Sequence, residues 1–407
     1  MIESTNDAAN DPIVLWLNGG PGSSSLIGLL TENGQIVTND ESLTNEIDGV
    51  PQVFLNPYSW STMSNMLYLE SPKGVGFSYC EGVKSSSNCV NTDESTALDA
   101  YEFLVNFFKA FPEYKANKFY ITGESYAGIY IPMLIEQIDL DVLGAKLNFV
   151  GAAIGNGCWV SSSSSSSVVE LYLLTDIISL SSTSSSQSLS SSSLSSPLQG
   201  NTVGTCAFSS AEAHQISADM YFGHGMYSQK LRSEIETACG SFSKLTTPCL
   251  AKLAEMETQI GTFDVYNIYD ECGSDERRRK LADRAHERMP FSAVRKMLSA
   301  DTVEVSTAQS FSINAGYQQA LNDYTCGAET AMDEWLSEPA VIKALHVKAG
   351  TVGMTYKKTA TDLRPLYSKH INKHQILIYS GDTDACVPYV GTENWTRGLN
   401  FTVVKDW

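Results

Sequence analysis

The sequence predicts an α/β fold whose mostly parallel sheet carries helices on both faces. Short apolar runs bounded by turn residues predict five strands, at residues 13–17, 66–70, 119–122, 148–154 and 375–379. Between them lie segments of helical periodicity. Residues 95–110 are the clearest, because apolar side chains there mostly recur every three or four residues. Strands that alternate with helices along one chain are typical of a parallel sheet.

The strand at residues 118–122 runs into Gly123-Glu-Ser-Tyr-Ala-Gly128 and then into a helical segment, residues 126–137. A sharp turn between strand and helix, with a serine at its apex, exposes the hydroxyl to a base and to a substrate carbonyl. Small residues must flank the serine so that the strand and the helix can pass closely. An ordinary turn would leave the same pattern, but we interpret Ser125 as a nucleophile.

Two other predicted strands end in turns that suit the same chemistry. The first leads into Asn18-Gly-Gly-Pro-Gly-Ser-Ser-Ser25, whose glycines leave backbone N–H groups unobstructed, as an oxyanion hole requires. In α/β-hydrolases, which have a serine at such a turn, the second oxyanion donor is the residue after the nucleophile, here Tyr126. The last strand is followed by Asp382 and Asp384, which come after the serine in chain order. Plain turns, with aspartates bonded to their own backbone, are the alternative.

Four blocks of this sequence resemble the signature blocks of the serine carboxypeptidase family: residues 18–25, 70–79, 123–128 and 381–384. The resemblance covers the chain from Asn10 to Trp407, except residues 160–199. It implies an α/β-hydrolase fold with a helical cap inserted in the second half. It also implies an enzyme that removes C-terminal residues from peptides by acyl-enzyme chemistry, with no cofactor and no metal.

The resemblance assigns roles to individual residues. Ser125 matches the nucleophile, Asp384 matches the triad acid, and the backbone N–H groups of Gly20 and Tyr126 match the oxyanion hole. The substrate's terminal carboxylate would be held by four residues: Asn18, Gly19, Glu32 and Glu124. Two acidic side chains can hold an anion if they share a proton, because a carboxylic acid donates a hydrogen bond where an ionised pair repels. We therefore expect activity at acidic pH that fades as this proton is lost.

The triad histidine of the family has no counterpart in this sequence. In the family it lies in a Gly-x-x-His-x-x-Pro block after the aspartate. None of the six histidines here stands in such a block: His214, His224, His286, His346, His370 and His374. We interpret each as a surface or cap histidine. Because a serine without a base is a weak nucleophile, we expect this polypeptide to be inactive and to be truncated at both ends.

Three functions therefore stay open. The first is a serine carboxypeptidase, the second is a catalytically inactive relative that binds peptides, and the third is an acyltransferase that uses the same triad on ester donors. The missing histidine permits the second. Asn18, Glu32 and Glu124 favour the first, because these groups serve a free carboxylate.

The resemblance divides the chain into a first core part at residues 1–155, a cap at 156–332 and a second core part at 333–407. Residues 160–199 are rich in serine and have no counterpart in the family. Such a tract usually means a flexible linker, but its removal joins Trp159 to Gly200 in continuous family-like sequence. Our hypothesis is a translated intron. Peptides from this tract in the mass spectrum of the native protein would contradict it.

Composition and cysteines point to a lumenal or secreted protein. The net charge of −19 argues against nucleic-acid binding, and no stretch reaches transmembrane length. We expect peptide or protein C-termini as partners and leave a homodimer open. Spacing suggests four disulfides, with Cys386 left over: Cys80–Cys89, Cys158–Cys206, Cys239–Cys249 and Cys272–Cys326. With glycosylation sequons at Asn394 and Asn400, they favour the vacuole, the lysosome or secretion.

Overall fold

A central sheet of five strands, all paired in parallel, organises the molecule. The computed structural model describes residues 1–39, 42, 46–47, 50–160, 206–207, 209–261, 263–269, 328–348 and 352–405. The sheet has the order β11-β9-β8-β1-β6. Its strands are β1 (Ile13–Leu17), β6 (Asn65–Tyr68), β8 (Phe119–Glu124), β9 (Phe149–Gly155) and β11 (Gln375–Tyr379). The predicted α/β fold with a mostly parallel sheet is confirmed.

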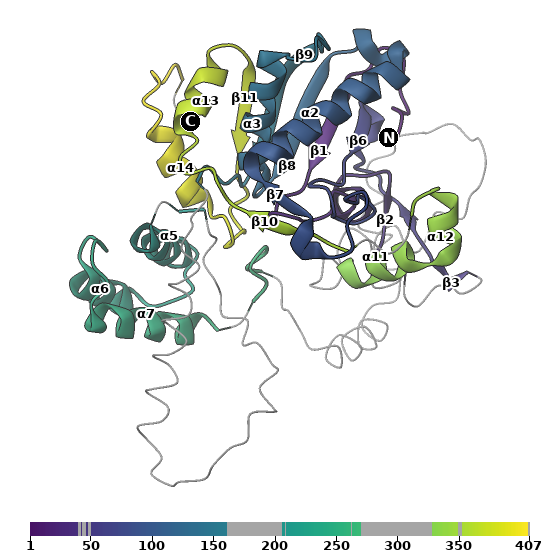
Figure 1. Ribbon diagram of the computed structural model, residues 1–407. Helices are drawn as coiled ribbons and strands as arrows, with labels where there is room; N and C mark the ends of the chain where they lie inside the picture. Colours follow the sequence, from purple (N-terminus) through teal and green to yellow (C-terminus); the bar gives the residue numbers. More distant parts are fainter. Residues whose placement is uncertain are drawn as a thin grey trace, which may run out of the picture.

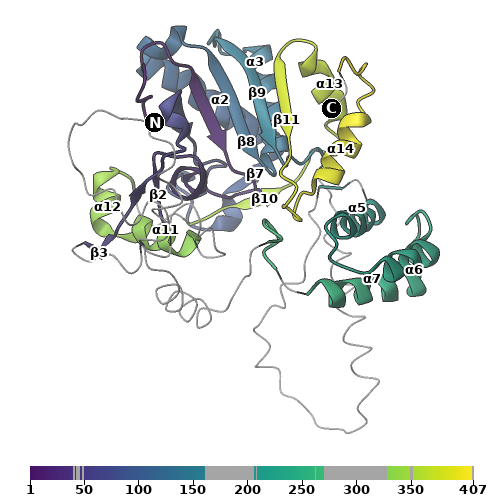
Figure 2. The ribbon, with the colours of Figure 1, turned by 180° about the vertical axis from the view of Figure 1, so that it is seen from behind.

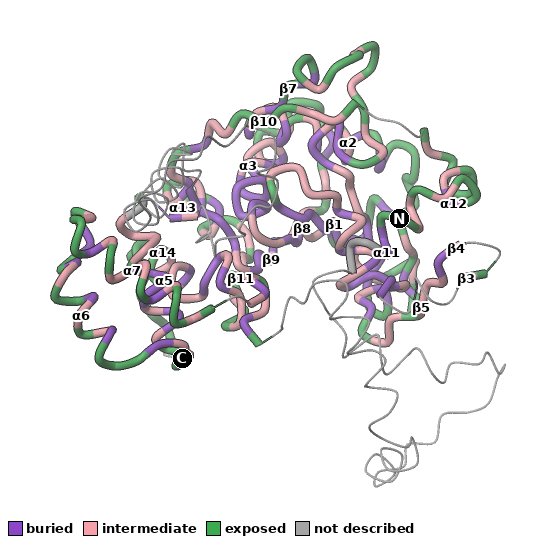
Figure 3. The backbone as a smooth tube through the Cα atoms, turned by 90° about the horizontal axis from the view of Figure 1, so that it is seen from below, coloured by how far each residue is buried: buried purple, intermediate pink, exposed green. Residues whose placement is uncertain are grey.

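The register of the sheet brings the strand ends together. Leu17 pairs with Gly123, Glu124 pairs with Gly155, and Gly155 pairs with Tyr379. Because these strands are parallel, the segments that follow them leave the sheet at one common edge. All five residues of β1 are buried, as expected for a central strand. Figure 3 shows buried backbone gathered along β1, β8 and β9.

Two long helices, α2 (Asp93–Ala110) and α3 (Ala127–Leu140), pack side by side over the sheet (Figure 1). Figure 2 shows the strands from behind. Helix α2 begins with a capping box, in which the Thr92 hydroxyl accepts from the Ser95 N–H and Ser95 bonds back to the Thr92 N–H. Its apolar stripe, including Tyr101 and Leu104, lies in the main core.

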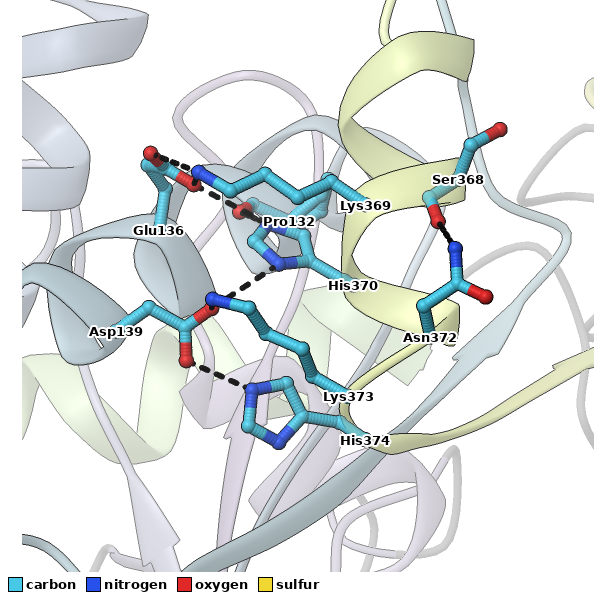
Figure 4. Close-up of polar contacts among 9 residues, drawn as sticks. All are labelled: Pro132, Glu136, Asp139, Ser368, Lys369, His370, Asn372, Lys373 and His374. Carbon is cyan, nitrogen blue, oxygen red and sulfur yellow. Dashed lines mark hydrogen bonds and ion pairs between the residues drawn. The ribbon is translucent and has the colours of Figure 1, made fainter.

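Helix α13 (Arg364–Ile371) compensates for a proline inside α3. Pro132 has no N–H, so the carbonyl of Gly128 loses its helical donor. The Tyr367 hydroxyl donates to that carbonyl at 2.6 Å, and a ring nitrogen of His370 lies 2.8 Å from the carbonyl oxygen of Pro132 (Figure 4). These two contacts attach α13 to α3, and through it they brace the helix that follows Ser125.

A second buried cluster joins three helices, α5 (Ser210–Gly223), α6 (Gln229–Cys239) and α7 (Thr247–Ile260). The chain after α7 contacts the turn that follows β11. There the Ile268 N–H donates to the Thr383 carbonyl at 3.0 Å, and the Ala385 N–H donates to the Val265 carbonyl at 2.8 Å. The division into core and cap stays a prediction.

Shorter elements complete the described structure. The 3₁₀ and π elements are η1 (Gly28–Glu32), η2 (Trp60–Thr62), η3 (Ser86–Asn88) and η4 (Pro112–Ala116). The small strands are β2 (Ile36–Val37), β3 (Glu46–Ile47), β4 (Val50–Pro51), β5 (Phe54–Leu55), β7 (Val90–Thr92) and β10 (Thr355–Lys357). The remaining helices are α11 (Ala328–Ser337), α12 (Pro339–Ala344) and α14 (Tyr389–Arg397).

Three of the predicted disulfides are confirmed: Cys80–Cys89, Cys158–Cys206 and Cys239–Cys249. Among the described cysteines, Cys386 is left unpaired, as expected. The fourth predicted pair, Cys272–Cys326, lies outside the described residues, as does the serine-rich tract from residue 161 onward. Of the helices that the structure describes, none is long and apolar enough to cross a membrane.

Candidate active site

Ser125 stands at the sharp turn between β8 and α3. Its φ of +57° lies in the left-handed region, which costs a residue other than glycine about 1–3 kcal/mol. Three backbone bonds hold it there. The Ser125 N–H donates to Gly155 O at 3.1 Å, and the Ser125 carbonyl accepts from Gly128 at 3.0 Å and from Cys158 at 2.9 Å. The strained turn that the sequence predicted is present, and β9 supports it.

Two glycines allow β8 and α3 to pass this closely to their neighbours. A Cβ atom at Gly123 would lie 2.3 Å from the Leu17 carbonyl oxygen, and one at Gly128 would lie 2.2 Å from the Cys158 carbonyl oxygen. Either contact is far shorter than packing allows, so a larger residue would push the neighbouring backbone away. The small residues around Ser125 therefore have the steric role that the sequence suggested.

The glycine-rich loop after β1 lies directly against the nucleophile. A Cβ atom at Gly19 would lie 2.4 Å from the Tyr126 backbone nitrogen and 2.9 Å from Ser125 Oγ. Gly20, at φ +104°, turns the loop in a conformation that side chains rarely allow. The structure thus brings Gly19 and Gly20 to the turn that contains Ser125 and Tyr126. This is the arrangement that an oxyanion hole built from both segments needs.

Asn18 joins the two glutamates that were predicted to hold a terminal carboxylate. Its side chain is 2% exposed, and its Nδ2 donates to Glu32 Oε1 at 3.0 Å and to Glu124 Oε1 at 2.9 Å. Its Oδ1 accepts from Trp16 Nε1 at 2.8 Å and from the Gly28 N–H at 3.0 Å. Both ends of the amide are bonded, so its orientation is fixed.

The electrostatics of this cluster favour a protonated Glu124. Burial raises the pKa of Glu124; the hydrogen bond from Asn18 opposes this rise, and the charge of Asp384 adds to it. The same acids also affect Tyr379, at the end of β11. Burial, together with the charges of Glu124 and Glu32, raises the pKa of Tyr379 to about 12. A proton on Glu124 is therefore retained above the usual pH range of a glutamate.

Asp384 lies in the turn after β11 and is held by the backbone. Its Oδ1 accepts from the Cys386 N–H at 2.7 Å and its Oδ2 from the Val387 N–H at 3.2 Å. Burial raises its pKa to about 6, although these hydrogen bonds act in the opposite direction. Asp382, the other candidate, belongs to an exposed part of the turn. The geometry therefore agrees with the choice of Asp384.

Sequence reasoning missed Asn156, which ties this turn to β9. Its Nδ2 donates to the Gly381 and Val387 carbonyls, both at 3.1 Å, and its Oδ1 accepts from the Gly381 N–H at 2.9 Å. A hydrogen bond from Asn156 also lowers the pKa of Asp384. A signal was present, because Gly155-Asn-Gly157 follows a strand at the same sheet edge.

The described histidines make their hydrogen bonds away from Ser125 and Asp384. Figure 4 shows His370 and His374 beside Pro132 and Asp139, and His374 Nε2 lies 2.8 Å from Asp139 Oδ1. Asp139 is 14 residues after Ser125, which along a helix is roughly 20 Å. The expectation of a surface or cap histidine is wrong for His370, which is 1% exposed and belongs to α13.

Four histidines remain, and one of them, His346, is exposed and lies just after α12. His224 Nδ1 lies 2.9 Å from the Met220 carbonyl at the end of α5, His214 belongs to α5, and His286 lies outside the described residues. In the described ranges, no group of three or more histidine, cysteine, aspartate or glutamate side chains is arranged to bind a metal ion.

Comparisons with known proteins find similarity to serine carboxypeptidases along the whole chain. A family model described as serine carboxypeptidase matches residues 1–196 and 183–407. Serine carboxypeptidase-like 21 of Arabidopsis thaliana is 30% identical, with an alignment that covers 100% of this chain and 76% of that protein. Lysosomal protective protein of Mus musculus is also 30% identical, over 98% of this chain and 74% of that protein.

Two further matches have the same kind of description. Serine carboxypeptidase 1 of Hordeum vulgare is 28% identical, over 100% of this chain and 76% of that protein. Among solved structures, a prohormone-processing carboxypeptidase from Saccharomyces cerevisiae aligns with a TM-score of 0.49 at 18% identity. That alignment covers 96% of this chain and 69% of the yeast chain.

Proposed function

Since this chain belongs to the serine carboxypeptidase family, we propose that it provides the active-site framework of an enzyme that removes C-terminal residues from peptides at acidic pH. The observation that supports this proposal is the hydrogen bonding of the Asn18 amide, whose two N–H groups donate to Glu32 and Glu124 beside the Ser125 turn. Because both N–H groups of Asn18 are donated to the glutamates, a protonated acid held by Asn18 is the group that can donate to a peptide's terminal carboxylate. No such group is needed to bind an internal peptide segment.

The chemistry assigned to each residue follows from its position. Ser125 Oγ attacks the last peptide carbonyl, and the backbone N–H groups of Gly20 and Tyr126 stabilise the negative oxygen that develops. As the C–N bond breaks, the leaving amine takes up the proton that the Ser125 hydroxyl lost on attack, and the C-terminal amino acid departs. Water then hydrolyses the acyl-enzyme. Asn18, Gly19, Glu32 and Glu124 position the substrate so that only its last bond reaches Ser125.

We assign the role of triad acid to Asp384, which follows β11 and is bonded to the Cys386 N–H and to Asn156. Its function is to orient and stabilise a histidine base, and the described histidines make their hydrogen bonds elsewhere. We therefore expect a polypeptide of residues 1–407 to hydrolyse blocked dipeptides weakly, at no more than about 10³–10⁴ over water, which is what a site retains without its triad.

The same observation favours a second candidate, a protein that binds peptide C-termini without cleaving them. Asn18, Glu32 and Glu124, which we propose to bind the carboxylate, are hydrogen-bonded together, whereas the described residues include no histidine hydrogen-bonded to Asp384. Both candidates share the acidic preference, because both need the proton on Glu124, whose pKa is raised. We propose an acidic compartment or secretion as the location. The relative named lysosomal protective protein supports this proposal.

Binding tests the subsite without requiring turnover. We expect an N-blocked dipeptide with a free carboxylate to bind at about pH 5 at least about tenfold more tightly than its C-terminal amide, measured by calorimetry. Asn18→Ala should remove this preference. Asn117→Ala is the matched control, because Asn117 is also buried and its Nδ2 donates to the backbone carbonyls of Ala9 and Asp11, just before β1. Equal affinity for acid and amide in the unaltered protein would contradict the proposal.

Substitution of the proposed nucleophile, Ser125, tests whether the protein cleaves peptides. In a form of the protein that has a working histidine base, Ser125→Ala should lower the rate of dipeptide hydrolysis by about 10⁴–10⁶ and leave the affinity for the free carboxylate unchanged. A variant that retains more than a few per cent of the rate would show that Ser125 is not the nucleophile.

A further inference from the structure

A buried carboxylate outside the catalytic set joins four segments of the chain behind the oxyanion loop. Asp93, the first residue of α2, is 0% exposed. Its Oδ1 accepts hydrogen bonds from the Tyr126 hydroxyl at 2.9 Å and the Tyr356 hydroxyl at 2.8 Å. Its Oδ2 accepts from the N–H and the hydroxyl of Thr359 and from the Ala360 N–H. A carboxylate at a helix N-terminus is also favoured by the helix dipole.

The tyrosine bonded to Asp93 directly follows the nucleophile and carries one of the two proposed oxyanion donors. The ring of Tyr126 packs edge-on against those of Tyr130 and Tyr356, with centroids 5.3 Å and 6.0 Å away. Lys358 Nζ lies 5.2 Å from the centroid of the Tyr126 ring. The Tyr126 side chain is therefore fixed at both its ring and its hydroxyl, which restricts the backbone that carries its N–H.

The same aromatic cluster reaches the glycine-rich loop. The Tyr130 hydroxyl accepts the Gly22 N–H at 3.2 Å, two residues beyond Gly20. On the other side of the loop, Ser24 Oγ donates to Glu70 Oε1 at 2.6 Å. The two segments that supply the oxyanion donors are thus held by neighbouring tyrosines, one bonded to Asp93 and the other to the loop itself.

We propose that Asp93, acting through Tyr126 and the adjoining Tyr130, is a positioning residue that holds the two oxyanion donors at their spacing around Ser125. The inference rests on the proposed function, because it assumes that Gly20 and Tyr126 donate to an oxyanion. Donor placement matters here because a site about 0.5 Å out of its productive geometry is markedly weakened. A carboxylate subsite that depends on Asn18 has no such dependence on Asp93.

Two ligands separate the oxyanion hole from the carboxylate subsite. The first is an N-blocked peptide aldehyde. Ser125 Oγ adds to its carbonyl carbon, one C–O bond forms as the C=O π bond breaks, and the hydroxyl proton ends on the former carbonyl oxygen. The second is the N-blocked dipeptide with a free carboxylate. Dissociation constants of both are measured at about pH 5 for the unaltered protein and for single variants.

Tyr126→Phe removes one hydroxyl and leaves Asp93 its other donors, so the fold is kept. We expect it to weaken aldehyde binding about tenfold, as loss of a charge-assisted hydrogen bond does, while affinity for the carboxylate peptide changes less than about twofold. Tyr130→Phe should act in the same way from the loop side. Tyr101→Phe is the matched control. Tyr101 is also 0% exposed, and its hydroxyl donates to Asp141 Oδ1 at 2.6 Å; neither affinity should change.

Each other result overturns the inference. If Tyr126→Phe and Tyr130→Phe bind the aldehyde as well as the unaltered protein does, the network has no positioning role, while the proposed function stands. If both ligands lose affinity equally, the network supports the fold only. If the unaltered protein binds neither ligand, the proposed function fails and the inference fails with it.

Discussion

Two carboxylates at opposite ends of α3 have opposite pKa shifts. Glu124 directly precedes the turn at Ser125, and burial, increased by the charge of Asp384, raises its pKa. Asp139 lies near the far end of the helix. Burial alone would raise its pKa too, but hydrogen bonds and charges from Lys373 and His374 lower it. An acid without a basic partner therefore stands at the end of β8, just before α3, and an acid with basic partners stands near the end of α3.

The partners explain the difference. Lys373 Nζ lies 3.0 Å from Asp139 Oδ2, and His370 Nδ1 lies 3.6 Å from the same oxygen (Figure 4). Basic side chains here also face the negative end of the α3 dipole. The neighbours that affect the pKa of Glu124 are an amide, Asn18, and another acid, Asp384. A fold that needed only stability would pair such acids. Leaving them unpaired is typical of sites where a proton takes part in binding.

The largest effect should appear in the pH dependence of ligand binding at the Glu124 end. In the Ser125→Ala background, affinity for a dipeptide with a free carboxylate should fall as pH rises through the raised pKa of Glu124. The limiting slope is about tenfold per pH unit, because the donating proton is lost. We expect the affinity to keep falling at this slope above the raised pKa, measured by calorimetry at a series of pH values.

Glu124→Gln should flatten this profile, since a glutamine amide donates at every pH. The C-terminal amide of the same dipeptide is the control ligand, and its affinity should vary little. An unaltered slope in Glu124→Gln would show that another group holds the proton.

The next largest effect concerns Asp384, whose pKa is raised to about 6. A raised folded-state pKa means stability that is fully present below the unfolded value, near 3.8, and is lost as pH rises through about 6. Asp384→Asn removes this loss. We expect the variant to be more stable than the unaltered protein by about 2 kcal/mol at about pH 7, with the gap closing near pH 4. Urea unfolding at several pH values measures it, and a destabilised variant at pH 7 would contradict this account.

The smallest effect is expected at Asp139 and has the opposite sign. A lowered folded-state pKa contributes stability that is present above the unfolded value, near 3.8, and disappears as pH falls through the folded value. Asp139→Asn should therefore lower the free energy of unfolding by about 1 kcal/mol at about pH 7 and match the unaltered protein near pH 2–3. If Asp139→Asn and Asp384→Asn changed stability in the same direction at pH 7, the contrast between the two ends of α3 would be wrong.

The sequence by itself determined the strands and the turn at Ser125. The predicted bounds of β1 and β11 are those observed, because turn residues on both sides of a short apolar run mark where a strand begins and ends. Gly123 and Gly128 could be interpreted because the requirement for small residues is local to the turn. The Asn18, Glu32 and Glu124 cluster came from the family resemblance, and the structure shows these side chains bonded together.

Only the tertiary structure decided which distant groups meet. Asn156 and Asp384 come from strands that neighbour one another only in the folded sheet. Asp93 and Tyr356 are separated by 263 residues, and His370 is buried against Pro132 from 238 residues away. Hydrogen bonds of this kind leave no periodicity or local spacing in the sequence. They depend on the sheet order and on the packing of α2 and α13 around α3, which the chain sets only when it folds.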